Sequence, residues 1–189
     1  MRVYLCDLVH SKWAVQGSNY LAGSSDITVP LNVASIGAFA KQKFDGHLDT
    51  AVFKSPEALL DALVDSTPDV VAFSNYIWNT HLNFQIGSWI KRTYPEIFIL
   101  MGGPGIPGDS KDIERFLHNN SYVDVYVMYE GEAGFTNTLQ VIEQYGRECF
   151  ERDHGLAGCA YLWDGRLVCH PHKEIKDVDQ MPSPYLTGE

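Results

Sequence analysis

The sequence lacks the features that mark several common classes of protein. It has no run of Lys and Arg, and 14 basic against 24 acidic residues give a formal net charge of -10. This charge pattern argues against nucleic acid as a partner. No apolar run approaches the ~18 residues that a membrane-spanning helix needs, which argues against a membrane location. The first residues also lack the apolar segment and cleavage site of a secretory signal peptide, so we expect a cytoplasmic protein.

Cysteine is scarce, and the four cysteines form no C-x-x-C pair of the kind used in metal and redox sites. This usage is typical of a reducing compartment. Cys159 and Cys169 flank Asp164-Gly165, which predicts a two-residue hairpin turn. With that turn, Cys169 lies opposite Ala160, and the two thiols face opposite sides of the ribbon. We therefore predict free, buried thiols and no disulfide.

The 189 residues do contain a repeated alternation of β and α patterns. With 45% hydrophobic and 12% aromatic residues, the chain can bury the core of one domain. Apolar, β-branched runs predict strands at 2–9, 47–53, 69–74, 97–101 and 123–128. Helical spacing predicts helices at 31–43, 56–64, 80–94, 110–118 and 131–145, with Ser55 as the N-cap of the second and Asp109 or Ser110 as that of the fourth. We therefore predict an α/β fold, a flavodoxin-like, doubly wound parallel five-stranded sheet in the order 2-1-3-4-5.

The pattern changes after Gly146. Residues 157–163 and 166–170 predict a β-hairpin, which we expect as an antiparallel appendage to the parallel sheet. The polar, proline-containing residues 171–189 predict a linker with neither strand nor helix.

Three loops at the carboxyl ends of the strands are candidates for ligand binding, because open α/β sheets bind ligands at this edge. Residues 74–79 (SNYIWN) close the third strand with a hydroxyl, two amides and two aromatic rings. Residues 102–105 (GGPG) remove side chains where a large group can lie against the backbone. Residues 130–132 (EGE) open the fifth helix.

Each loop also has a purely structural explanation. The glycines can form a tight turn, and the carboxylates can stabilise the helix dipole. Asn79 or Thr80 can cap the following helix while Trp78 packs in the core. His10 follows the first strand, where a lone histidine is more often hydrogen-bonded than a metal ligand. Residue chemistry alone therefore predicts a sizeable ligand at the carboxyl edge and assigns no catalytic residue.

Several motifs together resemble the N-terminal cobalamin (B12)-binding domain of B12-dependent radical SAM proteins. The resemblance covers nearly the whole chain, and it rests on the order and spacing of motifs that are individually loose. These motifs are residues 30–34 (PLNVA), 68–74 (PDVVAFS), 74–79 (SNYIWN), 100–104 (LMGGP), 123–125 (VDV), 130–132 with Phe135, the hairpin 155–168 and the exit segment 179–185 (DQMPSPY).

The resemblance implies that cobalamin lies over the carboxyl edge, with its nucleotide tail in a slot beside the first, third and fourth strands. Gly102 and Gly103 would leave room for the tail, and Ser74 would hydrogen-bond near it. The cofactor-binding residues implied are Ser74, Asn75, Tyr76, Gly102, Gly103, Pro104, Gly105, Glu130, Gly131 and Glu132, with His10 as a candidate axial ligand of cobalt.

The same resemblance implies a domain division. Residues 1–148 would form the Rossmann-like cobalamin-binding domain, 149–172 the hairpin extension, and 173–189 an exit linker toward an absent radical SAM domain. That domain, in the same or a separate chain, would be the partner that holds the [4Fe-4S] cluster and S-adenosylmethionine and performs methyl transfer or related radical chemistry. The chain alone would then be a cofactor module without catalytic residues.

Three departures from the family pattern bear on this expectation. The D-x-H-x-x-G motif after the first strand is replaced by Asp7-Leu8-Val9-His10, with Trp13 in place of the glycine. Tyr129 replaces the first glycine of the usual Gly-Glu-Gly-Glu run, and the cluster motif C-x-x-x-C-x-x-C is missing. Two alternatives therefore stay open: a degenerate domain without cofactor that serves for docking, and a flavodoxin-like domain that binds a nucleotide or flavin. The lack of a phosphate loop weighs against the second.

Overall fold

The computed structural model describes residues 1–9, 29–150, 152–172 and 174–187, and its strands form one sheet. The strand order is β2-β1-β3-β4-β5-β6-β7. The first five strands are parallel, whereas β6 and β7 are antiparallel. Their bounds are β1 Arg2–Cys6, β2 Asp49–Phe53, β3 Val70–Ser74, β4 Phe98–Gly102, β5 Val125–Val127, β6 Cys159–Trp163 and β7 Arg166–Cys169. The predicted order 2-1-3-4-5 is confirmed, and the predicted antiparallel hairpin is attached to this sheet next to β5, which brings the number of strands to seven.

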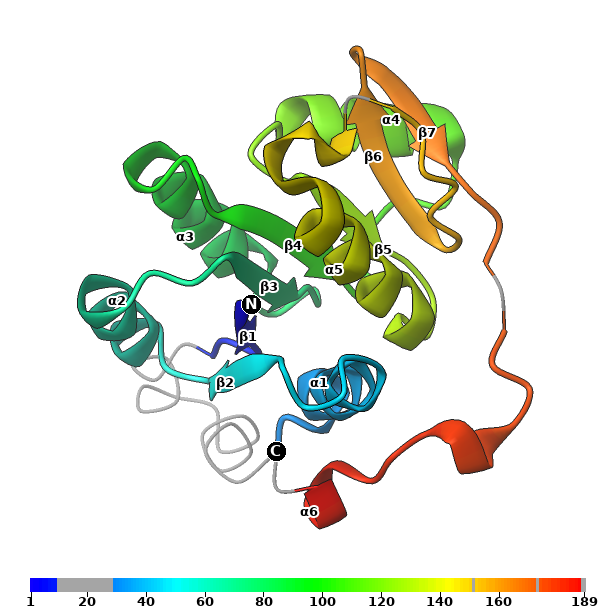
Figure 1. The fold of residues 1–189 in the computed structure, drawn as a ribbon. Helices are drawn as coiled ribbons and strands as arrows, with labels where there is room; N and C mark the ends of the chain where they lie inside the picture. Colours follow the sequence, from blue (N-terminus) through cyan, green and yellow to red (C-terminus); the bar gives the residue numbers. More distant parts are fainter. Residues whose placement is uncertain (10–28, 151, 173, 188–189) are drawn as a thin grey trace.

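Helices cover both faces of the sheet (Figure 1). One buried cluster joins the sheet to α2, α3 and α4, and a second joins the opposite face to α1 and α5. The helix bounds are α1 Leu31–Lys43, α2 Pro56–Asp65, α3 Thr80–Thr93, α4 Ser110–Asn119 and α5 Glu132–Tyr145, and the 3-10 turn η2 spans Gly146–Phe150. The doubly wound arrangement is therefore confirmed. No helix of the described segments is both long and apolar enough to cross a bilayer.

Local sequence signals fix where these elements begin. The Ser55 hydroxyl accepts the Ala58 N–H at 3.2 Å and caps α2, with Pro56 at the first helical position. The Asp109 carboxylate caps α4 by accepting the Lys111 N–H at 2.9 Å. All five residues of β3 are buried, as expected for a central parallel strand that is covered on both faces.

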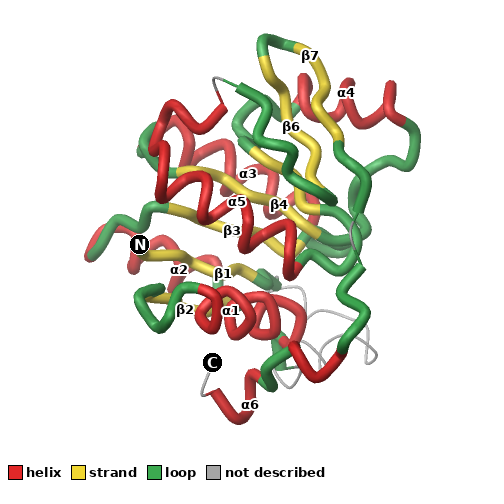
Figure 2. Tube along the Cα trace, turned by 45° about the vertical axis from the view of Figure 1, so that its right-hand side comes forward, coloured by secondary structure: helices red, strands yellow, loops and turns green. Residues whose placement is uncertain are grey.

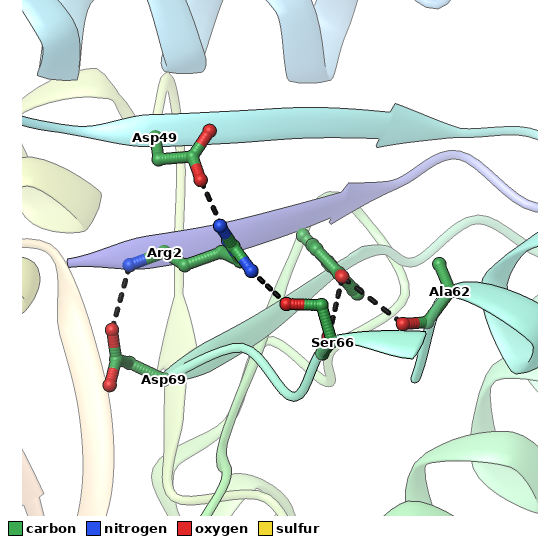
Figure 3. Close-up of polar contacts among 6 residues, drawn as sticks. Arg2, Asp49, Ala62, Ser66 and Asp69 are labelled. Atoms are coloured by element: carbon green, nitrogen blue, oxygen red, sulfur yellow. Dashed lines mark hydrogen bonds and ion pairs between the residues drawn. The ribbon is translucent and has the colours of Figure 1, made fainter. Parts of the chain in front are cut away.

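A polar cluster at the amino edge of the sheet ties three strands and a helix together (Figure 3). The Arg2 backbone N–H donates to Asp69 at 2.7 Å, and its Nε donates to Asp49 at 2.7 Å. Arg2 Nη1 also contacts Ser66 Oγ, and the Tyr4 hydroxyl donates to the Ser66 carbonyl at 2.6 Å. These bonds join the start of β1 to β2, to the residue before β3 and to the end of α2.

Two expectations on local structure were wrong. β1 ends at Cys6 and not at Val9. Residues 171–189 are not entirely linker, because η3 (Val178–Gln180) and a single helical turn, α6 (Pro184–Thr187), occur there. The chain after β7 runs along the molecule and brings α6 into contact with α1 (Figures 1 and 2). Pro184 is buried in this contact, which gives part of the exit segment a fixed place on the domain.

The cysteines are free, as predicted. Ala160 pairs with Cys169 in the hairpin register, which confirms the predicted turn and excludes a Cys159–Cys169 bond in this geometry. Cys6, Cys149 and Cys159 are buried, but Cys169 is exposed, so the expectation of buried thiols was wrong for that residue. β7 is the edge strand, and half of its surface faces solvent.

Candidate functional site

A cavity of about 430 Å³ opens at the carboxyl edge of the sheet, on the face covered by α1 and α5. Its floor comes from four adjacent strands: Leu5, Ala72 and Leu100 lie side by side across β1, β3 and β4, and Val127 of β5 lies beside Gly102. Other residues of the lining are Leu31, Asn32, Val33, Ser35, Ile36, Phe73, Ser74, Tyr76, Met101, Gly102, Gly103, Tyr129, Glu130, Gly131, Glu132 and Phe135. The size and the apolar floor are typical of a small-molecule site.

The cavity collects most of the candidate residues. Of the ten expected cofactor-binding positions, seven line it: Ser74, Tyr76, Gly102, Gly103, Glu130, Gly131 and Glu132. The other three, Asn75, Pro104 and Gly105, lie outside the lining. His10 lies outside the described residues. The roles assigned to all of these positions stay predictions.

Asn75 supplies a structural reason for two of the glycines. It is fully buried, its N–H donates to the Gly102 carbonyl at 2.6 Å, and its Nδ2 donates to the Tyr126 hydroxyl at 3.2 Å. A Cβ atom on Gly103 or Gly105 would stand 2.9 Å from the Asn75 carbonyl oxygen, and on Gly105 it would also collide with the Asn75 side-chain amide. The group that lies against these glycines is therefore Asn75 of the protein itself, through its backbone at Gly103 and through both its side chain and its backbone at Gly105.

Gly102 lines the cavity, as Gly103 does, but its nearest neighbour across the sheet is Val127 and not Asn75. It pairs with Ser74 across β3 and β4 and with Val127 across β4 and β5. A Cβ atom at this position would approach the Val127 carbonyl to 3.2 Å. The absence of a side chain at 102 thus keeps the cavity floor open at the centre of the sheet.

A polar group occupies one corner of the cavity. Asn32 Nδ2 donates to Ser74 Oγ at 2.5 Å, and Asp7 is hydrogen-bonded to both side chains. Burial raises the pKa of Asp7, while the positive charge of Lys54 and these hydrogen bonds lower it. Ser74 therefore lies at the expected position, but it is engaged by Asp7 and Asn32 as part of a three-residue network.

Sequence reasoning missed the contribution of α1 to the site. Asn32, Ser35 and Ile36 form the wall of the cavity opposite α5. The available signal was topological: α1 follows β1 and α5 follows β5, and the chain must place both on one face to build the doubly wound sheet. The space between those helices is where a cavity above the central strands has to lie.

Aromatic side chains stand at the same edge. Tyr76 and Trp78 stack with ring centroids 4.6 Å apart and an interplanar angle of 10°. Trp78 is 63% exposed, so the structural explanation that placed it in the core was wrong. Asn79 does begin α3, yet its side chain does not cap the helix; its Oδ1 accepts the Tyr76 N–H at 2.8 Å and holds the aromatic loop.

The loop before α5 bends sharply at the cavity wall. Tyr129 and Gly131 both have positive φ, +61° and +85°. Tyr129 packs against the His172 ring with centroids 4.9 Å apart, and Glu130 forms an ion pair with His172. The segment that leaves β7 is thus attached to the loop that carries Glu132.

Glu132 is the buried acidic residue of the cavity wall. It is only 8% exposed, and its Oε2 has no hydrogen-bond partner among the residues that the structure describes. Burial raises the pKa of its carboxyl, and Glu130 raises it further, whereas its own backbone N–H and His172 lower it. A buried carboxyl oxygen without a partner is costly, so this atom marks a place where a ligand can supply one.

A family model for the B12 binding domain matches residues 18–139, well over half of the chain. The chain belongs to the B12-binding domain family. The match spans α1, β2, β3, β4, β5 and most of α5. It thus includes residues of both helices and three of the four strands that line the cavity.

Two curated relatives resemble this B12-binding domain in sequence. The cobalamin-dependent radical SAM methyltransferase TokK of Streptomyces tokunonensis is 29% identical over 134 residues, which cover 70% of this chain and 18% of the relative. The 2-(S-pantetheinyl)-carbapenam-3-carboxylate methyltransferase of Streptantibioticus cattleyicolor is 33% identical over 146 residues, covering 72% and 20%. The chain spans about a fifth of the length of these relatives.

Solved structures show the same fold. The cobalamin-dependent S-adenosylmethionine radical enzyme OxsB, with aqua-cobalamin and S-adenosylmethionine bound, matches with a TM-score of 0.71 and 16% identity. OxsB with aqua-cobalamin alone matches with a TM-score of 0.67. Both alignments cover 99% of this chain and 24% of OxsB. The predicted family resemblance and flavodoxin-like fold are thus confirmed.

The residues of the cavity fit the tail of a cobalamin. An apolar floor suits a flat aromatic base, Gly102 keeps that floor clear, and the orphaned Glu132 oxygen offers a polar partner. No cluster of three or more His, Cys, Asp or Glu able to hold a metal ion occurs among the residues that the structure describes. The fit therefore rests on the cavity walls and not on a set of metal ligands.

Proposed function

We propose that this domain binds cobalamin, with the nucleotide tail in the cavity between α1 and α5. The observation that carries the proposal is the cavity itself, which opens at the carboxyl edge and has a deeply buried carboxyl without a partner in its wall. The stacked aromatic pair Tyr76 and Trp78, of which Trp78 is exposed, stands at the same edge and offers a surface for the macrocycle. Ser74, Gly102 and Gly103 would then contact the tail, as expected from the sequence.

We further propose that the domain serves a radical SAM enzyme. The relatives that support this role are several times longer than the chain. When bound, cobalamin would supply a cobalt centre able to carry a methyl group, while the domain supplies position and environment. The [4Fe-4S] cluster, S-adenosylmethionine and the reacting substrate would belong to a radical SAM domain in the same or another chain. The domain division at 148 and 172 is part of this proposal.

A retention experiment tests cobalamin binding. Purified protein is mixed with hydroxocobalamin or methylcobalamin, desalted, and titrated by visible absorbance. We expect roughly micromolar affinity or tighter. Retention of flavin mononucleotide with no retention of either cobalamin would favour the flavodoxin-like alternative. No retention of any of them, under reducing or oxidising conditions, would favour a docking domain without cofactor.

A pair of variants on one helix tests the location of the site. Ser35 lines the cavity, so Ser35→Trp fills it from the α1 side without altering a glycine or a strand. Gln42 lies on the same helix but is exposed and outside the cavity, so Gln42→Trp is the matched control. We expect Ser35→Trp to weaken cobalamin binding at least about tenfold, or ~1.4 kcal/mol, and Gln42→Trp to leave it unchanged. Equal affinities for the two variants would place the tail elsewhere. Gly103 is unsuitable for this test because its φ of +107° disfavours any side chain.

A further inference from the structure

The strongest unexplained group in the molecule is the Glu132 carboxyl. It stands at the first position of α5, 8% exposed, with one oxygen unpartnered. Among the described residues, no charged group satisfies it: the nearby Glu130 is itself acidic, and His172 is already ion-paired with Glu130. A ligand in the cavity that Glu132 lines can supply the missing partner.

The surroundings of Glu132 restrict the chemistry of that partner. Two acidic side chains at this wall repel an anion, so the phosphate of a nucleotide tail is disfavoured here. The floor formed by Leu5, Ala72 and Leu100 favours a flat apolar ring. The cavity therefore offers one polar atom, the Glu132 oxygen, beside an apolar floor. This combination favours a heteroaromatic ring that carries one basic nitrogen. In cobalamin this ring is the dimethylbenzimidazole at the end of the tail.

Resting on the proposed function, we propose that Glu132 recognises the basic ring nitrogen of the cobalamin tail through one shared proton. The carboxyl oxygen and the ring nitrogen hold a single proton between them, and no covalent bond forms or breaks. The nitrogen can accept this bond only when it is not coordinated to cobalt. Glu132 therefore selects the form of cobalamin in which the base has left the metal.

The shared proton gives this interaction a definite pH dependence. The groups that face the carboxyl are Glu130, which favours its protonated form, and His172, which opposes it. The complex keeps its proton at low pH and loses it as the pH rises through the pKa of the pair. Once the proton is lost, the carboxylate and the ring nitrogen are both hydrogen-bond acceptors and cannot bond to each other. The preference of the protein for a cobamide with the nucleotide tail over one without it must therefore fall as the pH rises.

The test compares methylcobalamin with methylcobinamide, which has the same upper ligand and lacks the nucleotide tail. The ratio of their dissociation constants, measured from about pH 5 to about pH 9, isolates the contribution of the tail. We expect a ratio for the wild type that favours methylcobalamin and falls at least about tenfold over this range. The visible spectrum of bound methylcobalamin, which reports whether the base is on cobalt, should show the base-off form.

Two substitutions separate recognition from simple packing. Glu132→Gln keeps an N–H donor and the shape of the side chain, so it should retain the preference for the tail but make it independent of pH. Glu132→Leu has no polar atom and should reduce the preference about tenfold or more. Glu143→Gln, which lies on the same helix but is exposed and outside the cavity, is the control and should keep the falling pH profile. Circular dichroism and urea unfolding check that each variant is folded.

The outcomes separate this inference from the proposed function. If the wild type binds methylcobalamin but Glu132→Gln shows the same pH profile, or Glu132→Leu the same preference for the tail, the role of Glu132 is wrong and cobalamin binding stands. A bound base-on spectrum would also overturn it. If the wild type binds neither cobamide, the proposed function fails, and the inference fails with it.

Discussion

Asn75 determines the shape of the glycine-rich turn at the residue scale. Its buried side chain donates to Tyr126, and its carbonyl oxygen accepts the Gly105 N–H at 3.1 Å. A methyl group at Gly105 would meet both the side-chain amide and the carbonyl of Asn75. We expect Gly105→Ala to lower the free energy of unfolding by about 1–3 kcal/mol, because a packed core cannot accommodate the added atom.

Gly108 provides the matched control for this substitution. A Cβ atom there has no heavy atom within 4 Å, and its backbone is not in the left-handed region. Gly108→Ala should leave the free energy of unfolding unchanged or slightly raised, since alanine restricts the unfolded chain. Urea denaturation of both variants decides the point. Equal stabilities would mean that Asn75 can move aside, and the turn would then be free to respond to a ligand.

The same residues show how far sequence reasoning reached. Ser74 and Gly102 were predicted at the site because they end buried strands, and strand ends can be read from apolar runs. The sequence could not show that Asn75 differs from these two residues. Neighbouring residues of an extended chain point to opposite sides, so the amide of Asn75 points into the core and not into the cavity. Likewise, the sequence could not show that Gly105 lies outside the cavity lining and Gly102 within it. Residue composition identifies a loop as a candidate binding site, whereas the direction in which each of its side chains points depends on packing in the folded protein.

At the element scale, hydrogen bonds of the Asp153 carboxylate connect the hairpin to the residues before it. The Asp153 carboxylate accepts the Gly155 N–H and the Tyr161 hydroxyl, each at 2.8 Å, and lies 2.7 Å from His170 Nε2. These bonds lower the pKa of Asp153 to about 2, chiefly through the Gly155 N–H. They join the loop before β6 to β6 itself and to the residue that follows β7.

This lowered pKa predicts a loss of stability in acid. Because the folded pKa lies below the ordinary 3.8, the carboxylate stabilises the fold above about pH 4 and loses that contribution as the pH falls toward about 2. We expect the free energy of unfolding to fall by about 1 kcal/mol more in the wild type than in Asp153→Asn over this interval, since solvent screens a side chain that is 37% exposed. Identical slopes in urea titrations at several pH values would contradict this role.

Elements were predicted more reliably than their ends. Helical spacing and the capping residues gave α1, α2 and α4 with correct starts, because those signals are local. β1 was predicted three residues too long, since Leu8 and Val9 continue the apolar run after the sheet pairing has ended. The turn of α6 has no amphipathic period and depends on its contact with α1, which only the folded chain brings together.

At the scale of the whole molecule, the chain covers the complete α/β fold but only about a fifth of its curated relatives. The sheet, both buried clusters and the cavity are contained within the described segments. The doubly wound order could be predicted from the βα alternation alone. The same topology gave the carboxyl edge as the place of a ligand, but not the residues of α1 that form one wall of the cavity, because those depend on how two distant helices pack over one face.

The positions of the cysteines lead to a last prediction, on whether this chain can itself hold an iron–sulfur cluster. Iron–sulfur clusters need several thiolates that converge on one site. Here Cys6 lies on the α2–α4 face, Cys149 and Cys159 lie in the opposite core, and Cys169 stands on the edge strand β7. Burial also raises the pKa of Cys149 to about 12 and that of Cys159 to about 11, which disfavours the thiolate that binds metal.

We therefore expect this 189-residue chain to retain cobalamin without assembling a cluster. After anaerobic reconstitution with iron and sulfide, bound iron should stay far below the amount of protein, and S-adenosylmethionine should not be cleaved under reducing conditions. Cobalamin retention by the same preparation is the internal control, because it shows that the domain is folded and its cavity accessible. A stoichiometric cluster would require the buried cysteines to leave their two separate cores, and would contradict the assignment of this chain as a cofactor module.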